Sequence, residues 1–388
     1  MTRVLLAFDK FKDALTAPEA VAAVAAALRE TQPDWTLDLA PLADGGEGFA
    51  SILTQAAQGR EVPVVATGPR GERRPAGFGL VPVSSIPLQA RAQLRLSDEA
   101  NAGATVAVIE MAAISGLALL SQDQRDPWQT TTLGTGELMR AAAGSGAVAI
   151  LLGVGGSATN DLGFGALAAL GLEFADAAGR PVSPPVPAGW PRIVRISGRV
   201  AAGLPPVYIA CDVTNPLLGP RGAAAVYGPQ KGLRAGDHAR LESESDRLAD
   251  LLCVHCGHPT ALKDAPGTGA AGGISFGLMA AAAAKLLPGF DLVSAWLDLE
   301  RKLAAADIVI TGEGRFDESS LEGKGPGAVA TRALALGKTV HVFAGQVTAA
   351  ARPGLALHAI TPAGIPLAQA LREAPNNLAA SARAVFAR

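Results

Sequence analysis

Four glycine-rich segments of this 388-residue chain carry acidic, amide or lysine side chains beside their glycines. They are Asp44 to Gly48, Gly153 to Asp161, Cys211 to Pro216 together with Gly228 to Gly232, and Thr311 to Asp317 together with Gly323 and Lys324. They lie at the ends of predicted strands, where the ligand crevices of α/β proteins form. One such segment usually marks only a turn, but four in one chain favour a site for a small ligand.

The segment Gly153 to Asp161 lies between a predicted strand and a helix expected from about Asn160 to Leu170. We expect the backbone N–H groups of Gly155, Gly156 and Ser157 to be exposed at the start of that helix. Backbone N–H groups at a helix N-terminus attract anions, so this loop predicts a phosphate site.

The same loop leaves a second interpretation open. From Gly153 to Ala158 it also satisfies G-x-G-x-x-A, the dinucleotide-binding pattern, and Asp176 follows at a plausible distance for a ribose contact. An NAD-dependent dehydrogenase acting on a hydroxy acid is therefore an alternative, although such a fold would not need the other acidic glycine loops.

Lysine is scarce in this chain, with 8 residues, and half of these lie in or beside the glycine-rich segments: Lys10, Lys12, Lys231 and Lys324. Together with Arg315 they could neutralise phosphates or clamp a carboxylate. Phosphoryl transfer needs little beyond this charge neutralisation, in-line positioning and an acceptor for the hydroxyl proton.

Three aspartates are candidates for the remaining roles in such a reaction. Asp44, Asp212 and Asp317 lie in the acidic glycine loops and offer a magnesium ligand and a general base. The five histidines have no G-x-S-x-G or cysteine nucleophile pattern nearby, so a hydrolase is a weak interpretation.

Composition excludes several other classes of function. The net charge of −2 gives no electrostatic footprint for nucleic acid or for an anionic membrane. Three cysteines fit a reducing compartment, and the run Cys253 to His258 resembles only half of a zinc site, so we interpret it as a helix end. The first nine residues have too short an apolar run for a signal peptide, which predicts a cytoplasmic protein.

The elements that must position these residues alternate between strand and helix at both ends of the chain. Strands are expected over Thr2 to Phe8, Thr36 to Ala40, Asp307 to Thr311, Thr339 to Phe343 and Leu357 to Thr361, with a helix opening at Thr16 in a capping box and another from about Pro326 to Leu336. These five strands predict one doubly wound domain with a parallel sheet, assembled from both chain ends.

The middle of the chain predicts a second, inserted α/β domain. Val62 to Leu96 resembles short antiparallel strands, buried strands are expected over Thr105 to Ile109, Ala147 to Leu152 and Val207 to Ala210, and a charged helix near Asp237 to Leu252. We therefore expect a Rossmann-like or flavodoxin-like domain over 1–60 and 291–388, and a mixed α/β domain over 61–290.

At these residues the sequence resembles the type I glycerate kinases. The matching segments are Phe8 to Lys12 with Leu15 to Ala17, Pro41 to Gly48, Gly155 to Asp161, Ala210 to Gly219, Gly228 to Gly232, Gly269 to Gly273, and Ile310 to Arg315 with Asp317. They occur in order from residue 8 to about 330. Two departures are local: Asp13 stands where the family commonly has glycine, and Glu322 and Gly325 flank Lys324 where it often has His and Ala.

The resemblance implies phosphorylation of D-glycerate by ATP with Mg²⁺, most often at the 2-hydroxyl in bacterial members, in a cleft between two α/β domains. On this basis Lys10, Lys12 and Arg315 are expected to bind the glycerate carboxylate and the transferred phosphoryl group, and Asp44 or Asp212 to act as base or metal ligand. The expected contacts of the nucleotide phosphates are Gly155, Gly156, Ser157, Thr159, Asn160 and Lys231. Glu313 and Asp317, with Asp212, are the expected metal ligands.

Three alternatives stay open at the level of sequence. The product could be 3-phosphoglycerate, the enzyme could be the dehydrogenase described above, or the chain could be a noncatalytic nucleotide-binding sensor. Small molecules are the expected partners in each case, and the chain could act as a monomer or a homodimer.

Overall fold

The computed structural model describes residues 1–97, 103–321 and 325–387, and the chain divides into two compact units. Unit 1 contains Met1–Asp44 and Val293–Arg388, and unit 2 contains Gly45–Leu292. Both ends of the chain thus form one unit, but residues 45–60, which we had expected in unit 1, belong to unit 2. The predicted cleft between the domains stays a prediction, and Lys324 lies outside the described residues.

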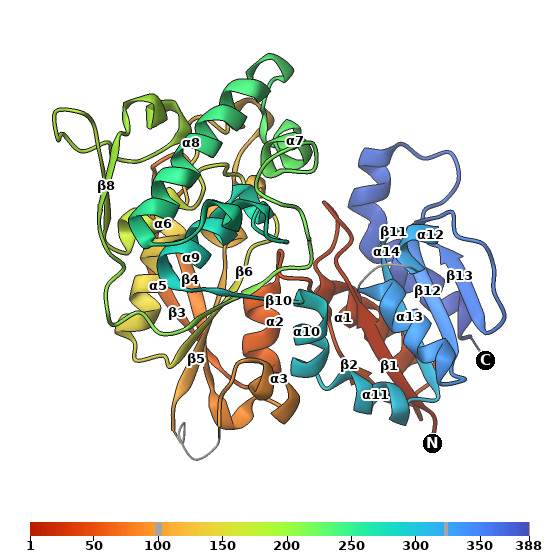
Figure 1. The fold of residues 1–388 in the computed structure, drawn as a ribbon. Helices are drawn as coiled ribbons and strands as arrows, with labels where there is room; N and C mark the ends of the chain where they lie inside the picture. Colours follow the sequence, from red (N-terminus) through yellow and green to blue (C-terminus); the bar gives the residue numbers. More distant parts are fainter. Residues whose placement is uncertain (98–102, 322–324, 388) are drawn as a thin grey trace. The chain divides into compact units, whose positions relative to one another are not determined.

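Unit 1 contains a five-stranded parallel sheet in the order β13-β12-β11-β1-β2. Its strands are β1 (Arg3–Phe8), β2 (Thr36–Leu39), β11 (Ile308–Phe316), β12 (Thr339–Val347) and β13 (Leu355–Ala359). Numbered along the chain this is the order 2-1-3-4-5 of flavodoxin-like sheets. In Figure 1 the red strands from the N-terminus lie beside the blue strands from the C-terminus. The five predicted strands are confirmed, although β11 and β12 continue beyond their predicted ends.

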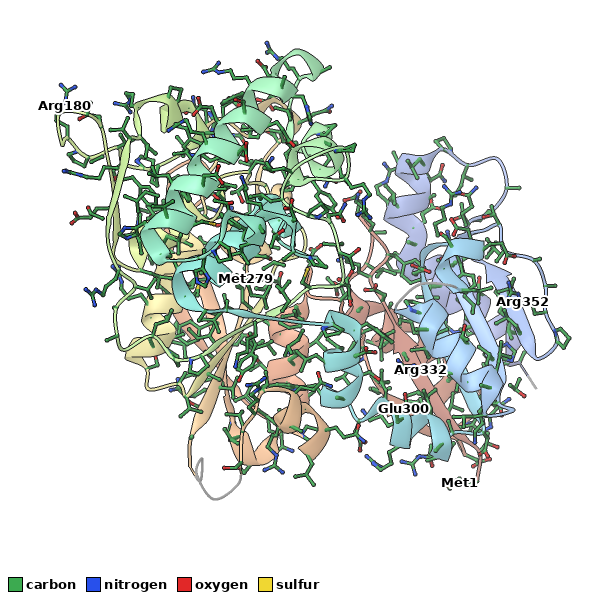
Figure 2. The ribbon with its side chains drawn as sticks, viewed as in Figure 1. Met1, Arg180, Met279, Glu300, Arg332 and Arg352 are labelled. Atoms are coloured by element: carbon green, nitrogen blue, oxygen red, sulfur yellow. The ribbon has the colours of Figure 1, made fainter. Side chains whose placement is uncertain are left out.

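Helices cover both faces of this sheet. They are α1 (Ala17–Thr31), α11 (Leu299–Ala305), α12 (Glu318–Leu321), α13 (Pro326–Ala335) and α14 (Leu367–Val385). Val4, Leu6 and Phe8 alternate along β1 and share a hydrophobic core with α1 and α14. α11 and α13 pack together against β1, tied by an ion pair between Glu300 and Arg332 with atoms 2.8 Å apart (Figure 2).

The start of α1 follows the local chemistry that the sequence predicted. The Thr16 hydroxyl accepts a hydrogen bond from the Glu19 backbone N–H, and the Glu19 carboxylate accepts one from the Thr16 backbone N–H. This capping box satisfies N–H groups that have no partner within the helix.

Unit 2 contains a mixed six-stranded sheet in the order β10-β9-β6-β5-β4-β3. Its strands are β3 (Arg60–Thr67), β4 (Arg73–Pro82), β5 (Thr105–Glu110), β6 (Ala149–Gly153), β9 (Val207–Ala210) and β10 (Lys285–Leu287). β3, β4 and β5 pair in antiparallel fashion, whereas β5, β6, β9 and β10 are parallel. The predicted antiparallel strands are confirmed up to Pro82, but residues 83–93 contain only short helices.

The remaining elements of unit 2 complete its core. The helices are α2 (Phe49–Ala56), α3 (Leu88–Gln93), α4 (Ala112–Ser115), α5 (Leu133–Gly144), α6 (Phe164–Ala169), α7 (Ala223–Tyr227), α8 (His238–Cys256), α9 (Ile274–Ala282) and α10 (Gly289–Trp296). The last of these, α10, crosses the boundary between the units. β7 (Leu172–Ala175) and β8 (Arg195–Gly198) form a small antiparallel pair. α8 ends at Cys256, within the run Cys253 to His258, so the predicted helix end is confirmed, and His255 shares a hydrogen bond with the Gly198 carbonyl oxygen. Among the described residues no helix is long and apolar enough to span a membrane.

Two histidines join the edge of the unit 1 sheet to the chain after α14. His341 Nδ1 and His358 Nε2 share a hydrogen bond of 3.0 Å, and the His341 ring lies 4.8 Å from the Phe386 ring. Burial, together with the nearby His358, lowers the pKa of His341 to about 4, and burial also lowers the pKa of His358. The folded protein therefore holds both rings neutral at neutral pH.

This pair predicts that unit 1 loses stability as the pH falls from about 6.5 toward 4. Over that range the unfolded chain binds protons at a histidine whose pKa is about 6.5, while His341 in the folded protein resists protonation until about pH 4. We expect His341→Gln to reduce this fall, measured as the melting temperature at pH 7 and at pH 5. His258→Gln, at an exposed site in unit 2, is the control, and an equal pH dependence in His341→Gln and the wild type would contradict the prediction.

Candidate active site

The predicted site residues of unit 1 gather at the carboxyl edge of its sheet. The strand order reverses between β1 and β11, and ligands of open parallel sheets bind outside the carboxyl ends of the strands at such a point. Lys10 and Lys12 follow β1, while Glu313 and Arg315 lie in the last residues of β11. Asp44 follows β2 and Asp317 follows β11, so all six lie at ends of neighbouring strands.

Carboxylates accumulate at this edge. The Asp9 backbone N–H donates to the Gly312 carbonyl oxygen at 3.0 Å, which aligns the ends of β1 and β11. Burial and the charge of Asp44 raise the pKa of Asp9 to about 6. Burial raises the pKa of Glu313 to about 7, with Asp9 adding to the increase and a hydrogen bond with Ser320 opposing it. An edge that disfavours negative charge in this way would be stabilised by a bound cation.

Basic residues lie next to these acidic residues. Arg315, which is exposed, forms an ion pair with Asp317 at 3.3 Å, and the Lys10 backbone N–H donates to an Asp9 carboxylate oxygen at 2.7 Å. Asp13, which directly follows Lys12, has a φ of 61°, in the left-handed region. That backbone conformation explains why glycine suits the position in the family that the sequence resembles.

In unit 2 the structure brings together four of the residues that we expected to contact the nucleotide. Lys231 is 2% exposed, and its Nζ donates to Ser157 Oγ at 2.9 Å, to the Thr159 carbonyl oxygen at 2.6 Å and to Asn160 Oδ1 at 3.3 Å. Burial lowers the pKa of Lys231 to about 7, although the charge of Asp161 opposes the decrease. The Thr159 hydroxyl is buried and has no hydrogen-bond partner among the described residues.

Asp161 fixes the second half of the same loop. Its fully buried carboxylate accepts hydrogen bonds from the backbone and hydroxyl of Thr132 at 2.7 and 2.9 Å, and from the backbone of Gly163 and Gly165. Burial raises the pKa of Asp161 and these four donors oppose the increase. The carboxylate thus joins the loop after β6 to the first turns of α5 and α6.

Comparison with known proteins identifies the family to which this arrangement belongs. A model of the glycerate kinase family matches residues 4–388. The chain belongs to the glycerate kinase family.

Relatives match it over nearly their whole length. A protein named Glycerate kinase from Bacillus subtilis is 37% identical over 99% of this chain and 97% of the relative, and Glycerate 2-kinase from Escherichia coli is 37% identical over 89% and 86%. The crystal structure of a putative glycerate kinase 2 from Salmonella typhimurium LT2 aligns with a TM-score of 0.77 and 38% identity, covering 99% of this chain and 97% of that one. The protein is thus a kinase whose acceptor is an alcohol group, and a nucleotide is one of its substrates.

The glycine loop of this glycerate kinase family member differs from our expectation in one respect. α6 begins at Phe164, with Gly163 before it at a φ of 74°, so Gly155, Gly156 and Ser157 do not lie at a helix N-terminus. The Gly155 backbone N–H donates instead to the Gly45 carbonyl oxygen at 2.9 Å. The helix starts later than predicted because the loop is held by tertiary hydrogen bonds that the local sequence does not display.

The same geometry removes the support for the dehydrogenase alternative. A dinucleotide motif needs its glycines to open a helix, and this loop does not. Asp176, the expected ribose contact, accepts hydrogen bonds from the backbone of Ala178 and Arg180 and pairs with the Arg180 side chain. The hydroxy-acid dehydrogenase is therefore wrong for this chain, in agreement with its family.

Asp212 has a structural contact as well as its predicted role. It lies just after β9, and its carboxylate accepts a hydrogen bond from the Phe290 backbone at 2.9 Å, at the start of α10. The described residues contain no group of three or more His, Cys, Asp or Glu side chains that could hold a metal ion. Kinase magnesium sites typically use one or two carboxylates together with substrate phosphates, so the carboxylates of Glu313 and Asp317 still fit such an ion.

Two residues of the site were not assigned a role from the sequence. Asp9 and Asp161 each lie within a segment that we singled out. Asp9 precedes a lysine and Asp161 ends a polar run, and both contexts are typical of a side chain exposed to solvent. Their importance depends on burial, which requires the packed fold. The position of Asp9 directly after a buried strand was the one available indication.

The burial of the Asp161 carboxylate predicts that this residue stabilises the fold, which its position in the sequence does not indicate. We expect Asp161→Asn to lower the free energy of unfolding by about 3 kcal/mol, because one amide oxygen cannot serve four donors and the charge of Lys231 loses its counterpart. Chemical denaturation monitored by circular dichroism measures this. Asp176→Asn is the matched control, since Asp176 also accepts backbone hydrogen bonds but lies near the surface, and we expect little change there. Equal effects of the two substitutions would refute the role of Asp161.

Proposed function

We propose that this member of the glycerate kinase family transfers the γ-phosphoryl group of ATP to the 2-hydroxyl of D-glycerate, giving 2-phospho-D-glycerate and ADP. The observation that carries the proposal is the buried network of Lys231 with Ser157, Thr159 and Asn160, which holds polar groups after β6, at the carboxyl end of the parallel strands of unit 2. The choice of the 2-hydroxyl is supported by the Escherichia coli relative, which is named Glycerate 2-kinase.

Chemically, the substrate hydroxyl oxygen forms a bond to the γ-phosphorus while the bond from that phosphorus to the bridging oxygen of ADP breaks. The hydroxyl proton passes to a carboxylate base, for which Asp44 and Asp212 are the candidates. The cationic groups of Lys10, Lys12 and Arg315 would bind the glycerate carboxylate and offset charge on the transferred group.

The unit 2 loop would contact the nucleotide phosphates. Ser157, Thr159 and Asn160 offer hydroxyl and amide groups, and Gly155 and Gly156 carry no side chain that would block a phosphate. We assign Lys231 a positioning role in this loop, because its Nζ is already bonded to three oxygens of the loop.

Mg²⁺ is the cation that we propose for the acidic edge of unit 1. Glu313 and Asp317 would hold it, with Asp212 as a further candidate, and their carboxylate oxygens are ligands that Mg²⁺ prefers. When bound, the ion neutralises charge on the phosphates and helps align them. We further propose that the enzyme acts in the cytoplasm, as a monomer or homodimer.

The position of phosphorylation can be read directly from the product. With ATP, Mg²⁺ and D-glycerate, we expect phosphorus NMR to show a signal that splits into the doublet of a phosphate on a CH group and coincides with added 2-phosphoglycerate. L-glycerate is the stereochemical control, and we expect it to react much more slowly. A signal matching 3-phosphoglycerate would contradict the 2-position while leaving the kinase activity intact, and binding of ATP without turnover would favour the sensor alternative.

The base can be separated from a metal ligand by two conservative substitutions. We expect Asp44→Asn or Asp212→Asn to lower kcat by about 100-fold or more with folding intact, because removing a general base typically costs that much. Asp212→Asn keeps a side-chain oxygen that can accept the hydrogen bond from the Phe290 backbone N–H. Rescue by high Mg²⁺ concentration would mark the residue as a metal ligand, and lack of rescue would mark it as the base. Full turnover in both variants would rule out the assignment.

A further inference from the structure

The buried lysine of the unit 2 loop has no donor left for a phosphate. An ammonium group has three N–H donors, and Lys231 Nζ already donates to three oxygens of that loop. Asp161 adds a buried negative charge nearby. Phosphate oxygens form their strongest hydrogen bonds with cationic donors. A nucleotide at this loop therefore calls for a second cationic side chain whose donors are not already bonded.

The chain from Leu117 to Thr130 borders this loop. The Leu117 backbone N–H donates to the Gly156 carbonyl oxygen at 2.8 Å. The Thr130 hydroxyl donates to the Ala158 carbonyl oxygen at 3.2 Å. Both ends of the segment are thus tied to the glycine loop.

Arg125 lies within this segment, against the residue that follows Lys231. Gly232 has a φ of 93°, and an added Cβ there would lie 2.2 Å from the Arg125 carbonyl oxygen and 3.3 Å from the Arg125 Cβ. So close an approach of the two backbones requires a residue without a side chain. The Arg125 side chain therefore starts beside the network that Lys231 forms.

The guanidinium group of Arg125 has no acidic partner. Arg125 is partly buried, and its Nε is covered and has no hydrogen-bond partner among the described residues, whereas the two Nη groups at the tip remain accessible. The neighbouring Asp126 carboxylate accepts a hydrogen bond from the Trp128 backbone at 3.0 Å instead. None of the ion pairs between described residues includes Arg125. Arginine is rarely buried without a paired anion, so this arrangement favours an anionic ligand.

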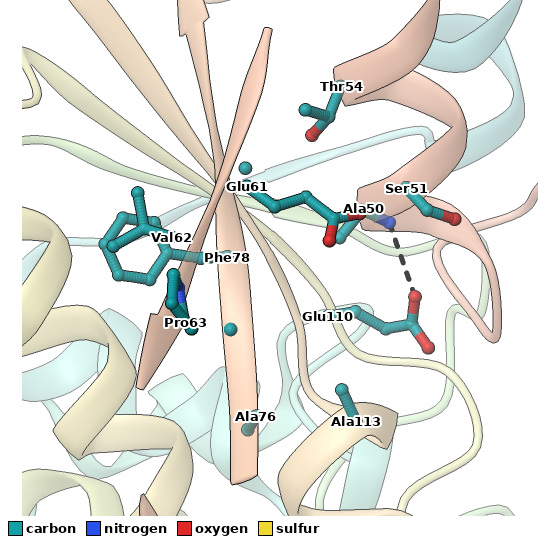
Figure 3. Close-up of a pocket in the computed structure, with 12 residues that line it drawn as sticks. Ala50, Ser51, Thr54, Glu61, Val62, Pro63, Ala76, Phe78, Glu110 and Ala113 are labelled. Carbon is teal, nitrogen blue, oxygen red and sulfur yellow. Dashed lines mark hydrogen bonds between the residues drawn. The ribbon is translucent and has the colours of Figure 1, made fainter. Parts of the chain in front are cut away.

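A pocket elsewhere in unit 2 is unsuited to such a ligand. It lies beside α2 and is lined by Glu61 and Glu110 but by no basic residue, and the Glu110 carboxylate accepts a hydrogen bond from the Ala50 backbone at 3.3 Å (Figure 3). Because like charges repel, this pocket disfavours a nucleotide. Arg125 offers the complementary charge.

We propose that Arg125 is a further nucleotide-binding residue of this kinase, and that its guanidinium group binds a phosphate oxygen of ATP beside the loop after β6. A planar guanidinium group donates two parallel hydrogen bonds to a phosphate, and its charge offsets that of the nucleotide. This role rests on the proposed binding of ATP at that loop. The two cations then have different tasks: Lys231 holds the loop, and Arg125 contacts the ligand.

Arg125→Met tests this role, because it removes the charge and keeps most of the apolar stem of the side chain. With D-glycerate saturating, we expect the KM for ATP to rise at least about tenfold, since a charge-assisted contact is lost. The KM for D-glycerate at saturating ATP should stay within about twofold of the wild-type value. Arg125→Lys keeps the charge but loses the planar fork, so it should retain part of the affinity for ATP.

The melting temperature without nucleotide separates ligand binding from a structural role. Arg125 has no ion pair to lose, so Arg125→Met should melt at the wild-type temperature when circular dichroism is followed. Arg195→Met, at an exposed arginine on β8, is the matched control and should change neither the melting temperature nor the two KM values. A clearly lower melting temperature in Arg125→Met than in this control would assign Arg125 to the fold rather than to the ligand.

Three kinetic results would also overturn the role of Arg125. They are an unchanged KM for ATP in Arg125→Met, an equal rise in both KM values, and a rise confined to D-glycerate, which would place the glycerate carboxylate at this residue instead. Each of them leaves turnover by the wild type intact, so the proposed function survives. A wild-type enzyme that does not phosphorylate D-glycerate with ATP would overturn the proposed function and the role of Arg125 together.

Discussion

The arrangement of unit 2 depends on a lysine held inside the protein. An isolated ammonium group is costly to bury. Lys231 can stay buried because its Nζ donates hydrogen bonds to three oxygens of the loop after β6, and because Asp161 supplies a nearby negative charge. Asp161 in turn binds the starts of α5 and α6. One connected set of polar groups therefore fixes segments that lie far apart in the sequence.

Close backbone approach around this network explains part of the glycine content. Gly272 has a φ of 74°, and an added Cβ there would lie 2.0 Å from the Thr159 carbonyl oxygen, which is the oxygen that Lys231 binds. A Cβ at Gly155 would similarly lie 2.6 Å from the Gly46 Cα. These glycines permit the loops to pack against each other, so their first role is structural and any contact with phosphate comes in addition to it.

The sequence predicted the elements whose cause is local. β9 is found over the predicted residues because a short β-branched and aromatic run ends in polar residues, and α1 begins where Thr16 and Glu19 form a capping box. The start of α6 and the placement of residues 45–60 were not predicted, because both depend on tertiary contacts such as the bond from Gly155 to Gly45. Burial of Lys231 was hidden for the same reason: as a residue type, lysine indicates a solvated side chain.

We propose that Lys231 positions the loop after β6 for the nucleotide. Its most direct test is the dissociation constant of ATP with Mg²⁺, measured calorimetrically without glycerate for the wild type, Lys231→Met and the control Lys285→Met, at a temperature where circular dichroism shows all three folded. We predict that Lys231→Met binds ATP at least about tenfold more weakly while Lys285→Met binds it normally, since Lys285 lies on β10 over the Tyr208 ring and outside the network. Wild-type affinity for ATP in a folded Lys231→Met variant would contradict the account.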